Sequence, residues 1–411
     1  MRNGDFLTGT IGMINSSCDL AGIDDRHRRV LTSISRKLTV DYPVRLDNGT
    51  TTMIRGYRFQ HNNARGPYKG GIRIAPGIVD SEVAALSMLM SLKSAVLSIP
   101  YGGAKGGIVA NTSTLSSAEL EKVCRGYIRA IRPIIGPNTD IPAPDMNVSE
   151  ECIGWMLDEY ERMVGYHAPQ VITGKPMVLG GSRGRSSAVA WGGMFIMEEV
   201  ERRLKNHNKA FAVQGFGNVG GNLAKILYGR NKNVRAVSDS TGGTFREDGL
   251  DITALAKHKE KTGSVTGFPG GTDISNEDLL GLDVDVLVPA ALENQISEKN
   301  ADAISAKVLL CLANGPINQK GSEMLAARDI LVVPDILANG GGVIVSYLEW
   351  AQGREGFSWR GSEVSLRLKE VMKSAFKDVY DTAREYDKDM YTAAYILGVN
   401  HIVTAMKARS I

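Results

Sequence analysis

Hydrophobic and polar residues alternate with a helical period between Asp80 and Ser98. Four positions separated by four, three and four residues share one helix face: Leu86, Met90, Lys93 and Leu97. Asp80 or Ser81 is placed to cap the first turn of this helix. The pattern therefore predicts an amphipathic helix whose apolar face includes a lysine, either as a snorkelling side chain or as a partly desolvated ammonium that meets a carboxylate.

A second helix is predicted after Ser116, which forms a capping box with Glu119. Gly136 and Pro137 are expected to end this helix. The loop TDIPAPDMN follows, and its two prolines stiffen the chain ahead of Asp145. The first 180 residues are thus predicted to contain amphipathic helices joined by glycine- and proline-rich loops.

From about residue 209, buried strands alternate with helices. KAFAVQGFGNVGGNLAKILYG predicts a strand, a tight glycine turn and a helix, and NVRAVSDSTGG predicts the next strand and its exit loop. VDVLVPAAL, KVLLCLANGP and DILVVPDILANGGG each predict a buried strand that ends in a loop. This alternation indicates a parallel α/β sheet, and the sequence returns to a helical period after Gly361.

Length and composition narrow the class of protein. A chain of 411 residues is too long to fold around one hydrophobic core of ordinary size, so two domains are expected. A net charge of +3 without a dense basic block argues against a nucleic-acid partner. No apolar run reaches the roughly 18 residues that span a membrane, and the N-terminus does not resemble a signal peptide. Scattered cysteines and isolated histidines predict a cytoplasmic protein with reduced thiols and no structural metal.

Two lysines lie among glycines: Lys69 in GPYKGGIR and Lys105 in PYGGAKGG. Glycine permits close approach of backbone or ligand, so an ammonium held there can point into a cleft and meet an anionic or carbonyl-bearing ligand. If these groups cluster with Lys93, they depress one another's pKa, and one can serve as a general base while the others hold carboxylates. The alternative is that all three are ordinary solvated lysines.

Gly215-Phe-Gly217-Asn-Val-Gly220 has the spacing of a dinucleotide-binding turn. It follows a predicted strand and opens a predicted helix, and Asp239 ends the next strand 19 residues after Gly220. In this fingerprint the glycines admit a pyrophosphate to the helix N-terminus, and the acidic residue binds the adenosine ribose. Asp239 favours NAD on charge grounds, although Ser240 and the following threonine could donate hydrogen bonds to the extra phosphate of NADP.

With these residues in place, the chain resembles the glutamate dehydrogenases of the hexameric type, in the superfamily of amino-acid dehydrogenases. The resemblance covers almost the whole chain and is carried by HNNARGPYKGGIR, SLKSAV, PYGGAKGG, DIPAPD, ITGKP, GGSRGR, GFGNVG, VPAALENQI, ANGP and SYLEW. It implies reversible oxidative deamination of L-glutamate to 2-oxoglutarate and ammonium, with hydride transfer to NAD or NADP. It also implies assembly as a homohexamer.

The resemblance assigns substrate contacts to five residues. Lys69, helped by Ser346, looks like the lysine that binds the side-chain carboxylate of glutamate. Lys93 resembles the lysine that holds the α-carboxylate, with Met90 beside it and Arg185 nearby. An uncompensated lysine in an apolar pocket would be costly to desolvate, so Lys69 and Ser346 argue for a dicarboxylic substrate.

Lys105 resembles the catalytic lysine of the family, and Asp145 its proton-transfer partner. The former would polarise the attacking water, and the latter would move protons to and from the substrate nitrogen. The cofactor-binding residues implied by the same comparison are Gly215, Phe216, Gly217, Asn218, Val219, Gly220, Asp239, Ser240, Ala290, Ala291, Asn314 and Asn339.

Several positions depart from the family pattern. Val189 replaces the usual threonine that helps to seat the nicotinamide carboxamide, and Trp191 stands where a smaller or charged residue is common. Cys311 replaces an acidic residue before ANGP, and Gly340 changes the usual NAGGV to NGGGV. These departures concern cofactor affinity and rate and leave the substrate lysines intact.

Two alternatives therefore remain beside a glutamate dehydrogenase: a branched-chain or aromatic amino-acid dehydrogenase, and a catalytically weak regulatory subunit of a glutamate dehydrogenase. The expected architecture has a substrate-binding and assembly domain over residues 1–180. A Rossmann-type domain is expected over residues 181–341, and C-terminal helices over residues 342–411 are expected to pack back on the first domain.

Overall fold

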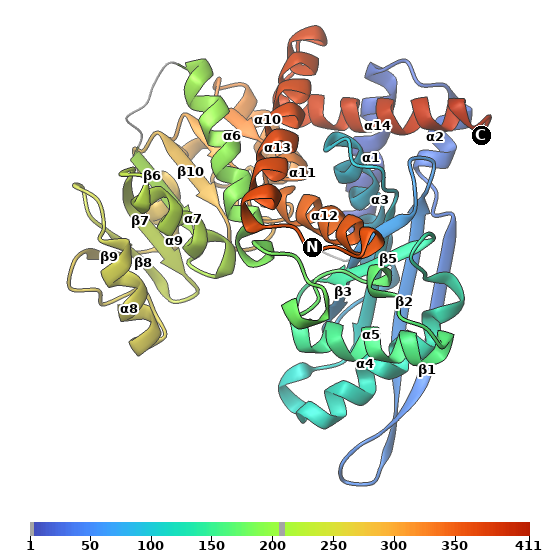
Figure 1. Ribbon diagram of the computed structural model, residues 1–411. Coiled ribbons are helices and arrows are strands. Elements are labelled where there is room, and N and C mark those ends of the chain that lie inside the picture. The colour runs from blue at the N-terminus through green and yellow to red at the C-terminus, as the bar shows by residue number, and fades with distance from the viewer. Residues whose placement is uncertain (1–3, 205–209) are drawn as a thin grey trace. The chain divides into compact units, whose positions relative to one another are not determined.

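The computed structural model describes residues 4–204 and 210–411, which form two compact units (Figure 1). The first unit contains the chain up to Arg185, Val343–Ser365 and Tyr395–Ile411. The second contains Ser186–Gly342 and Leu366–Ala394. Each unit combines a sheet with helices, which confirms the predicted α/β class with two domains. None of the helices described is long and apolar enough to cross a membrane.

A mixed five-stranded sheet lies at the centre of the first unit. Its strands are β1 (Arg36–Arg45), β2 (Thr51–Asn62), β3 (Tyr68–Ile74), β4 (Gly103–Val109) and β5 (Asp140–Pro144). Their order is β1-β2-β4-β3-β5, so β4 is inserted between β2 and β3. β3 runs parallel to both β4 and β5, whereas β2 is antiparallel to β1 and β4. The carboxyl ends of β3 and β5 therefore meet at one edge of the sheet.

Helices cover both faces of this sheet. They are α1 (Gly4–Leu20), α2 (Asp25–Leu31), α3 (Asp80–Val96), α4 (Ser117–Ile131), α5 (Glu150–Val164), most of α12 (Gly341–Glu355) and most of α14 (Met390–Ala408). Helices α4 and α5 lie side by side and share a large apolar core with the strands (Figure 1). α3 packs on β2 and β4 over a separate apolar cluster.

Local signals place two of these helices as predicted. The Ser116 hydroxyl accepts from the backbone N–H of Glu119, and the Glu119 carboxylate accepts from the backbone N–H of Ser116. These two bonds confirm the capping box. The helix ends at Ile131 and continues as a 3₁₀ turn, so it stops before the glycine and proline expected to end it. The predicted cap of α3 is wrong: the cap position is Val79, which makes no side-chain cap, while the Asp80 carboxylate accepts from the next backbone N–H.

The second unit is built on a seven-stranded sheet of order β12-β11-β10-β6-β7-β8-β9. The strands are β6 (Ala210–Gln214), β7 (Asn233–Asp239), β8 (Gly242–Phe245), β9 (Thr272–Ile274), β10 (Val286–Pro289), β11 (Val308–Leu310) and β12 (Leu331–Val333). Lys209, where the sequence pattern begins the first strand, lies outside the described residues. The five strands from β12 to β7 are parallel and nearly all buried, as expected for a sheet covered on both faces. The antiparallel pair β8–β9 was not predicted.

The helices of this unit are α6 (Ala188–Leu204), α7 (Asn218–Gly229), α8 (Ile252–Thr262), α9 (Asn276–Gly281), α10 (Gln319–Ala326), α11 (Asp335–Ala338) and most of α13 (Gly361–Glu385). The chain leaves β6 toward β7 on one side, and β10 pairs with β6 on the other. The strand order therefore reverses between β6 and β10, and open parallel sheets bind nucleotides at the carboxyl ends of such a pair of strands.

Candidate active site

The two glycine-flanked lysines lie on neighbouring strands of the first unit, Lys69 on β3 and Lys105 on β4. Both side chains are almost fully buried, so neither is an ordinary solvated lysine. The flanking glycines allow this arrangement: a Cβ at Gly70 would lie 1.6 Å from the carbonyl oxygen of Ala104. β3 and β4 can thus approach each other only because glycine occupies this position.

Lys105 is paired with Asp145, which follows the end of β5. Its Nζ lies 2.8 Å from Oδ2 of Asp145, and Nε of Arg73 donates to the same oxygen at 2.9 Å. Gly71 leaves the space for this carboxylate, because a Cβ there would lie 2.8 Å from Cβ of Asp145. The structure therefore brings together the two residues predicted to move protons, and it adds an arginine.

The pKa values of both members of this pair are lowered, but for different reasons. Burial lowers the pKa of Lys105 despite the attraction of Asp145, and the charge of Arg73 lowers it further. Burial opposes ionisation of Asp145, yet Lys105 and Arg73 outweigh it and hold the pKa of Asp145 well below its usual range. The carboxylate is thus ionised, and the lysine gives up its proton more readily than a solvated lysine.

Among the described residues, Lys69 forms hydrogen bonds only with neutral groups. Its Nζ donates to Oγ1 of Thr173 at 2.9 Å and lies 3.5 Å from the carbonyl oxygen of Pro142. Burial, followed by repulsion from Arg185 and Arg58, holds the pKa of Lys69 well below its usual value. A buried ammonium that forms no ion pair with any described residue is suited to receive a carboxylate from a ligand.

The other predicted substrate residues of this unit lie on two helices and a loop. Lys93 is buried in the last turn of α3, and Met90 is half-buried one turn earlier. Arg185 is half-buried with an Nε that has no hydrogen-bond partner among the described residues. Ser346 is buried on α12. The structure thus places all five predicted substrate residues in the first unit, with Lys93 and Lys69 withdrawn from solvent.

A buried ion pair that the sequence did not single out supports the Lys69 pocket. Glu349 and Lys175 are fully buried, and their oxygen and nitrogen lie 2.6 Å apart. Glu349 also accepts from the backbone N–H groups of Gly174 and Lys175. These bonds hold the chain segment that carries Thr173, and Ser346 lies one turn before Glu349 on α12. The motifs ITGKP and SYLEW contained these residues, but nothing in either motif indicated that they pair.

The predicted dinucleotide turn forms in the second unit as a strand–turn–helix. Gly215 has a φ of +95°, and a Cβ there would lie 2.9 Å from the carbonyl oxygen of Ala290. A Cβ at Gly220 would lie 1.9 Å from the carbonyl oxygen of Gly215, whereas one at Gly217 would meet nothing within 4 Å. The first and third glycines therefore serve packing, and the second leaves open space at the start of α7.

This turn fits a pyrophosphate. Gly217 is the cap residue of α7 and provides no side-chain hydrogen bond, so the first N–H groups of α7 remain available to an anion. Phe216, Asn218 and Val219 lie in the same turn or at the start of the helix, as predicted. Ala290 and Ala291 lie beside Gly215 at the point where the strand order reverses.

Asp239 ends β7 as predicted, but its carboxylate already accepts four hydrogen bonds. Oδ1 accepts from the backbone N–H and the hydroxyl of Thr241, and Oδ2 accepts from Nζ of Lys259 and the N–H of Val265, each at 2.7–3.0 Å. A ribose hydroxyl would have to share or replace one of these donors. Ser240 is exposed beside it. Lys259, which neutralises the carboxylate, was not identified from the sequence.

Two predicted asparagines lie together further along the sheet. Nδ2 of Asn339 donates to Oδ1 of Asn314 at 2.9 Å and to the carbonyl of Ala313, while its own Oδ1 accepts no hydrogen bond within the described residues. A buried amide oxygen without a donor fits a carboxamide N–H, the polar group of a nicotinamide. Cys311, on the adjoining loop, is fully buried, and burial raises the pKa of its thiol well above its usual value.

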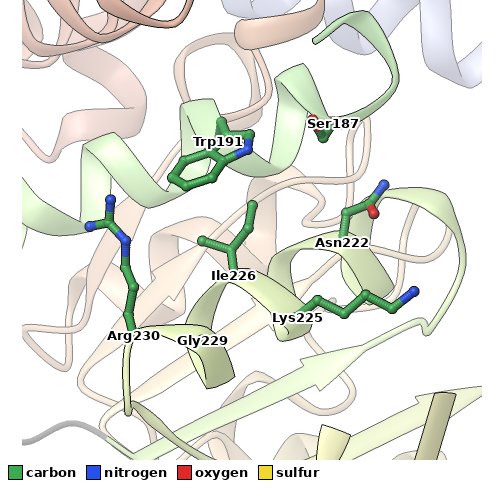
Figure 2. A pocket seen from close by; sticks show the side chains of 7 residues that line it. All are labelled: Ser187, Trp191, Asn222, Lys225, Ile226, Gly229 and Arg230. Carbon is green, nitrogen blue, oxygen red and sulfur yellow. The ribbon is translucent and has the colours of Figure 1, made fainter. Parts of the chain in front are cut away.

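The departure at Trp191 has a structural explanation. Figure 2 shows a pocket between α6 and α7, lined by Ser187, Trp191, Asn222, Lys225, Ile226, Gly229 and Arg230. The guanidinium of Arg230 lies over the Trp191 ring at 5.4 Å, and Arg230 also donates to Glu198 of α6 at 2.6 Å. The tryptophan thus braces α6 against α7, and none of the residues that line this pocket belongs to the predicted cofactor set.

The fold and these residues define a class: two-domain dehydrogenases that use a nicotinamide dinucleotide. Comparison with known proteins is more specific. Residues 35–162 match the dimerisation domain of the Glu/Leu/Phe/Val dehydrogenases, and residues 180–410 match the Glutamate/Leucine/Phenylalanine/Valine dehydrogenase domain. The chain belongs to the Glu/Leu/Phe/Val dehydrogenase family.

Among named relatives, the cryptic catabolic NAD-specific glutamate dehydrogenase GudB of Bacillus subtilis is 44% identical over 98% of this chain and 96% of its own. The NAD-specific glutamate dehydrogenase of Staphylococcus aureus is 42% identical over 99% of both chains. The crystal structure of the hetero-hexameric glutamate dehydrogenase from Thermus thermophilus matches with a TM-score of 0.94 and 33% identity, over 99% of this chain and 97% of that one.

Proposed function

We propose that this protein is an NAD-dependent glutamate dehydrogenase, which interconverts L-glutamate with 2-oxoglutarate and ammonium. The observation that carries the proposal is Lys69, a buried lysine whose hydrogen-bond partners within the described part of the chain are one hydroxyl and one carbonyl. Such a group suits the side-chain carboxylate of a dicarboxylic substrate and would be costly in the apolar pocket of a branched-chain or aromatic amino-acid dehydrogenase. The named relatives above are glutamate dehydrogenases.

The substrate would be held at both ends. Lys69, with the hydroxyls of Thr173 and Ser346, would bind its side-chain carboxylate. Lys93 would bind the α-carboxylate, with Met90 in contact and Arg185 contributing charge. Two fixed carboxylates leave the reacting carbon no freedom to turn, which is the main contribution that positioning makes to catalysis.

Lys105 and Asp145 would manage the protons. When bound, NAD would supply the acceptor for the hydride, and loss of the hydride would leave the substrate carbon as an iminium. Because its pKa is lowered, Lys105 could take the proton of the water that attacks this carbon. Asp145 is ionised, accepts hydrogen bonds from Lys105, and would receive and return protons of the substrate nitrogen.

The cofactor would bind through the glycine turn. The N–H groups at the start of α7 would hold the pyrophosphate, with Gly217 giving the backbone free approach. Asn314 and Asn339 would face the nicotinamide carboxamide. The pairing of Asp239 with Lys259 weakens the negative charge that would repel NADP, so we propose preference for NAD with some use of NADP.

The remaining alternative, a catalytically weak regulatory subunit, is not favoured. It was motivated by Val189 and Trp191, and the contacts of Trp191 are explained by its packing against α7. We further propose a homohexamer that works in the cytoplasm. One solved relative is a hetero-hexamer, which supports an assembly of six subunits, and β1 is a ten-residue edge strand available for pairing within the matched dimerisation domain.

The test is reductive amination of 2-oxoglutarate with ammonium, using NADH and NADPH in separate assays. Pyruvate and 2-oxoisocaproate serve as comparison substrates. Lys105→Ala should abolish turnover, and Lys122→Ala, an exposed lysine of α4, is the matched control that should not change it. Turnover confined to 2-oxoglutarate supports the proposal. Cofactor binding without turnover of any keto acid would instead establish the regulatory subunit.

A further inference from the structure

Arg73 joins the predicted catalytic carboxylate to the helix that carries two predicted substrate residues. It lies near the end of β3, beside β5, and the N–H of Asp145 donates to the carbonyl of Ile72. Nε of Arg73 donates to Asp145, and Nη1 donates to Glu82. Glu82 lies in the first turn of α3, the helix of Met90 and Lys93.

The guanidinium is fixed by this double contact. Its plane is rigid and its donors have fixed directions, so Arg73 cannot rotate toward solvent without losing one of two carboxylates. The side chains of Arg73, Glu82 and Asp145 retain exposures of only 16%, 23% and 21%. At such partial burial, ion pairs are less screened by salt than those on an open surface.

Both cations approach the same oxygen of Asp145. Nζ of Lys105 and Nε of Arg73 each lie nearest to Oδ2, at 2.8 and 2.9 Å. Oδ1 is therefore the carboxylate oxygen of Asp145 that is not the nearest oxygen to either cation. A substrate amine needs such an acceptor, oriented and not already saturated, to exchange its proton.

We propose that Arg73, braced by Glu82, is a positioning residue that orients Asp145 so that Oδ1 serves the substrate nitrogen. The inference rests on the proposed amino-acid dehydrogenase activity. The charged groups recorded around Asp145 come from three elements: Arg73 of β3, Lys105 of β4 and Glu82 of α3. The two positive charges of Arg73 and Lys105 balance the two negative charges of Glu82 and Asp145. Removing the charge of Arg73 makes the cluster more negative, whereas removing the charge of Glu82 makes it more positive.

The experiment compares kcat, KM and the pH profile of kcat/KM for Arg73→Met, Arg73→Lys and Glu82→Gln, with Arg55→Met as control. Arg55 pairs with Asp41 on the exposed face of β1 and β2. The Arg55→Met variant therefore shows the effect of removing an ion-paired arginine from the same sheet away from the site. Native fold is checked by circular dichroism. NADH binding is measured as well, because the proposed cofactor residues belong to the second unit.

In Arg73→Met we expect kcat to fall about 10- to 100-fold while the KM for 2-oxoglutarate changes much less, because the proposed carboxylate-binding lysines are untouched. Both limbs of the profile should move to higher pH, since loss of the positive charge raises the pKa of Asp145 and of Lys105. Glu82→Gln should move both limbs to lower pH, because Arg73 is then less neutralised. Arg73→Lys keeps the positive charge, so the limbs of its pH profile should lie closer to those of the unchanged protein than its kcat does.

A folded Arg73→Met variant with unchanged kcat would overturn the proposal. Limbs that stay in place, or that move in the same direction for Arg73→Met and Glu82→Gln, would also overturn it, because a role in folding alone predicts no opposite shifts. Failure of the proposed activity itself is separate: it would appear as absence of turnover in the unchanged protein and in Arg55→Met.

Discussion

Binding of a dicarboxylate should take up a proton at Lys69. In the free protein, burial and two guanidinium groups hold the pKa of Lys69 well below its usual value, and its Nζ forms hydrogen bonds with a hydroxyl and a carbonyl. A ligand carboxylate about 4 Å from Nζ would favour the ammonium by about 4 kcal/mol at an effective dielectric constant of about 20. That energy raises the pKa of Lys69 in the complex above its value in the free protein.

The sign of the pH effect follows from this rise. Between the pKa of Lys69 in the free protein and its higher pKa in the complex, binding consumes up to one proton. Affinity for the dicarboxylate therefore falls as pH rises through this window, by up to about 1.4 kcal/mol, or tenfold, per pH unit. Below the free-state pKa the lysine is already charged, and binding should become independent of this group.

Isothermal titration calorimetry measures this uptake directly. Glutarate is titrated into the complex with NADH in phosphate and in Tris, whose ionisation enthalpies differ, and the difference in heat gives the number of protons taken up. Lys69→Met should lose both the uptake and most of the affinity, whereas the exposed-site variant Lys122→Ala should keep both. Tight binding of glutarate with no proton uptake over the whole pH range would refute the reasoning.

Three further changes test separate parts of the structure. Gly70→Ala places a Cβ 1.6 Å from the carbonyl oxygen of Ala104, so it should destabilise the protein by about 3 kcal/mol or more and abolish activity; an unchanged Tm would contradict the strand packing. Glu349→Gln leaves the buried Lys175 without its counter-charge and should lower the free energy of unfolding, measured by heat or urea, by about 3–5 kcal/mol. A negligible change in this free energy would contradict the role given to the ion pair. Lys259→Ala restores the charge of Asp239, so the ratio of kcat/KM for NADH to that for NADPH should rise about tenfold; an unchanged ratio would separate Lys259 from cofactor choice.

The sequence predicted best what depends on neighbouring residues. The glycine turn before α7, the capping box at Ser116 and the buried strands of the second sheet are all local patterns, and each was confirmed. The cap of α3 was predicted wrongly because several residue types can precede a helix, and the apolar Val79 took the position. The short antiparallel strands β8 and β9 lack a clear alternation, so only the pairing of β8 with β7 and of β9 with β8 reveals them.

Contacts across the sheet could not be read from the chain. Arg73 meets Asp145 because β3 and β5 are parallel neighbours, and Lys105 reaches the same carboxylate because β4 is inserted between β2 and β3. This order follows from the packing of the whole unit, and no spacing in the sequence specifies it. The same limit applies to Asp239, whose position was predicted while its four internal donors come from residues up to 26 positions away.

Two buried lysines show why partners decide function. Lys175 and Lys69 both adjoin glycine in the sequence, and both are withdrawn from water. Lys175 is neutralised by Glu349 at 2.6 Å, so its charge is satisfied within the fold and its role is structural. Lys69 forms no ion pair with the residues that the structure describes, so the free protein retains a desolvation cost that a ligand carboxylate would relieve. Because this cost is present only without ligand, it strengthens binding of a dicarboxylate relative to an apolar substrate, which leaves the cost in place.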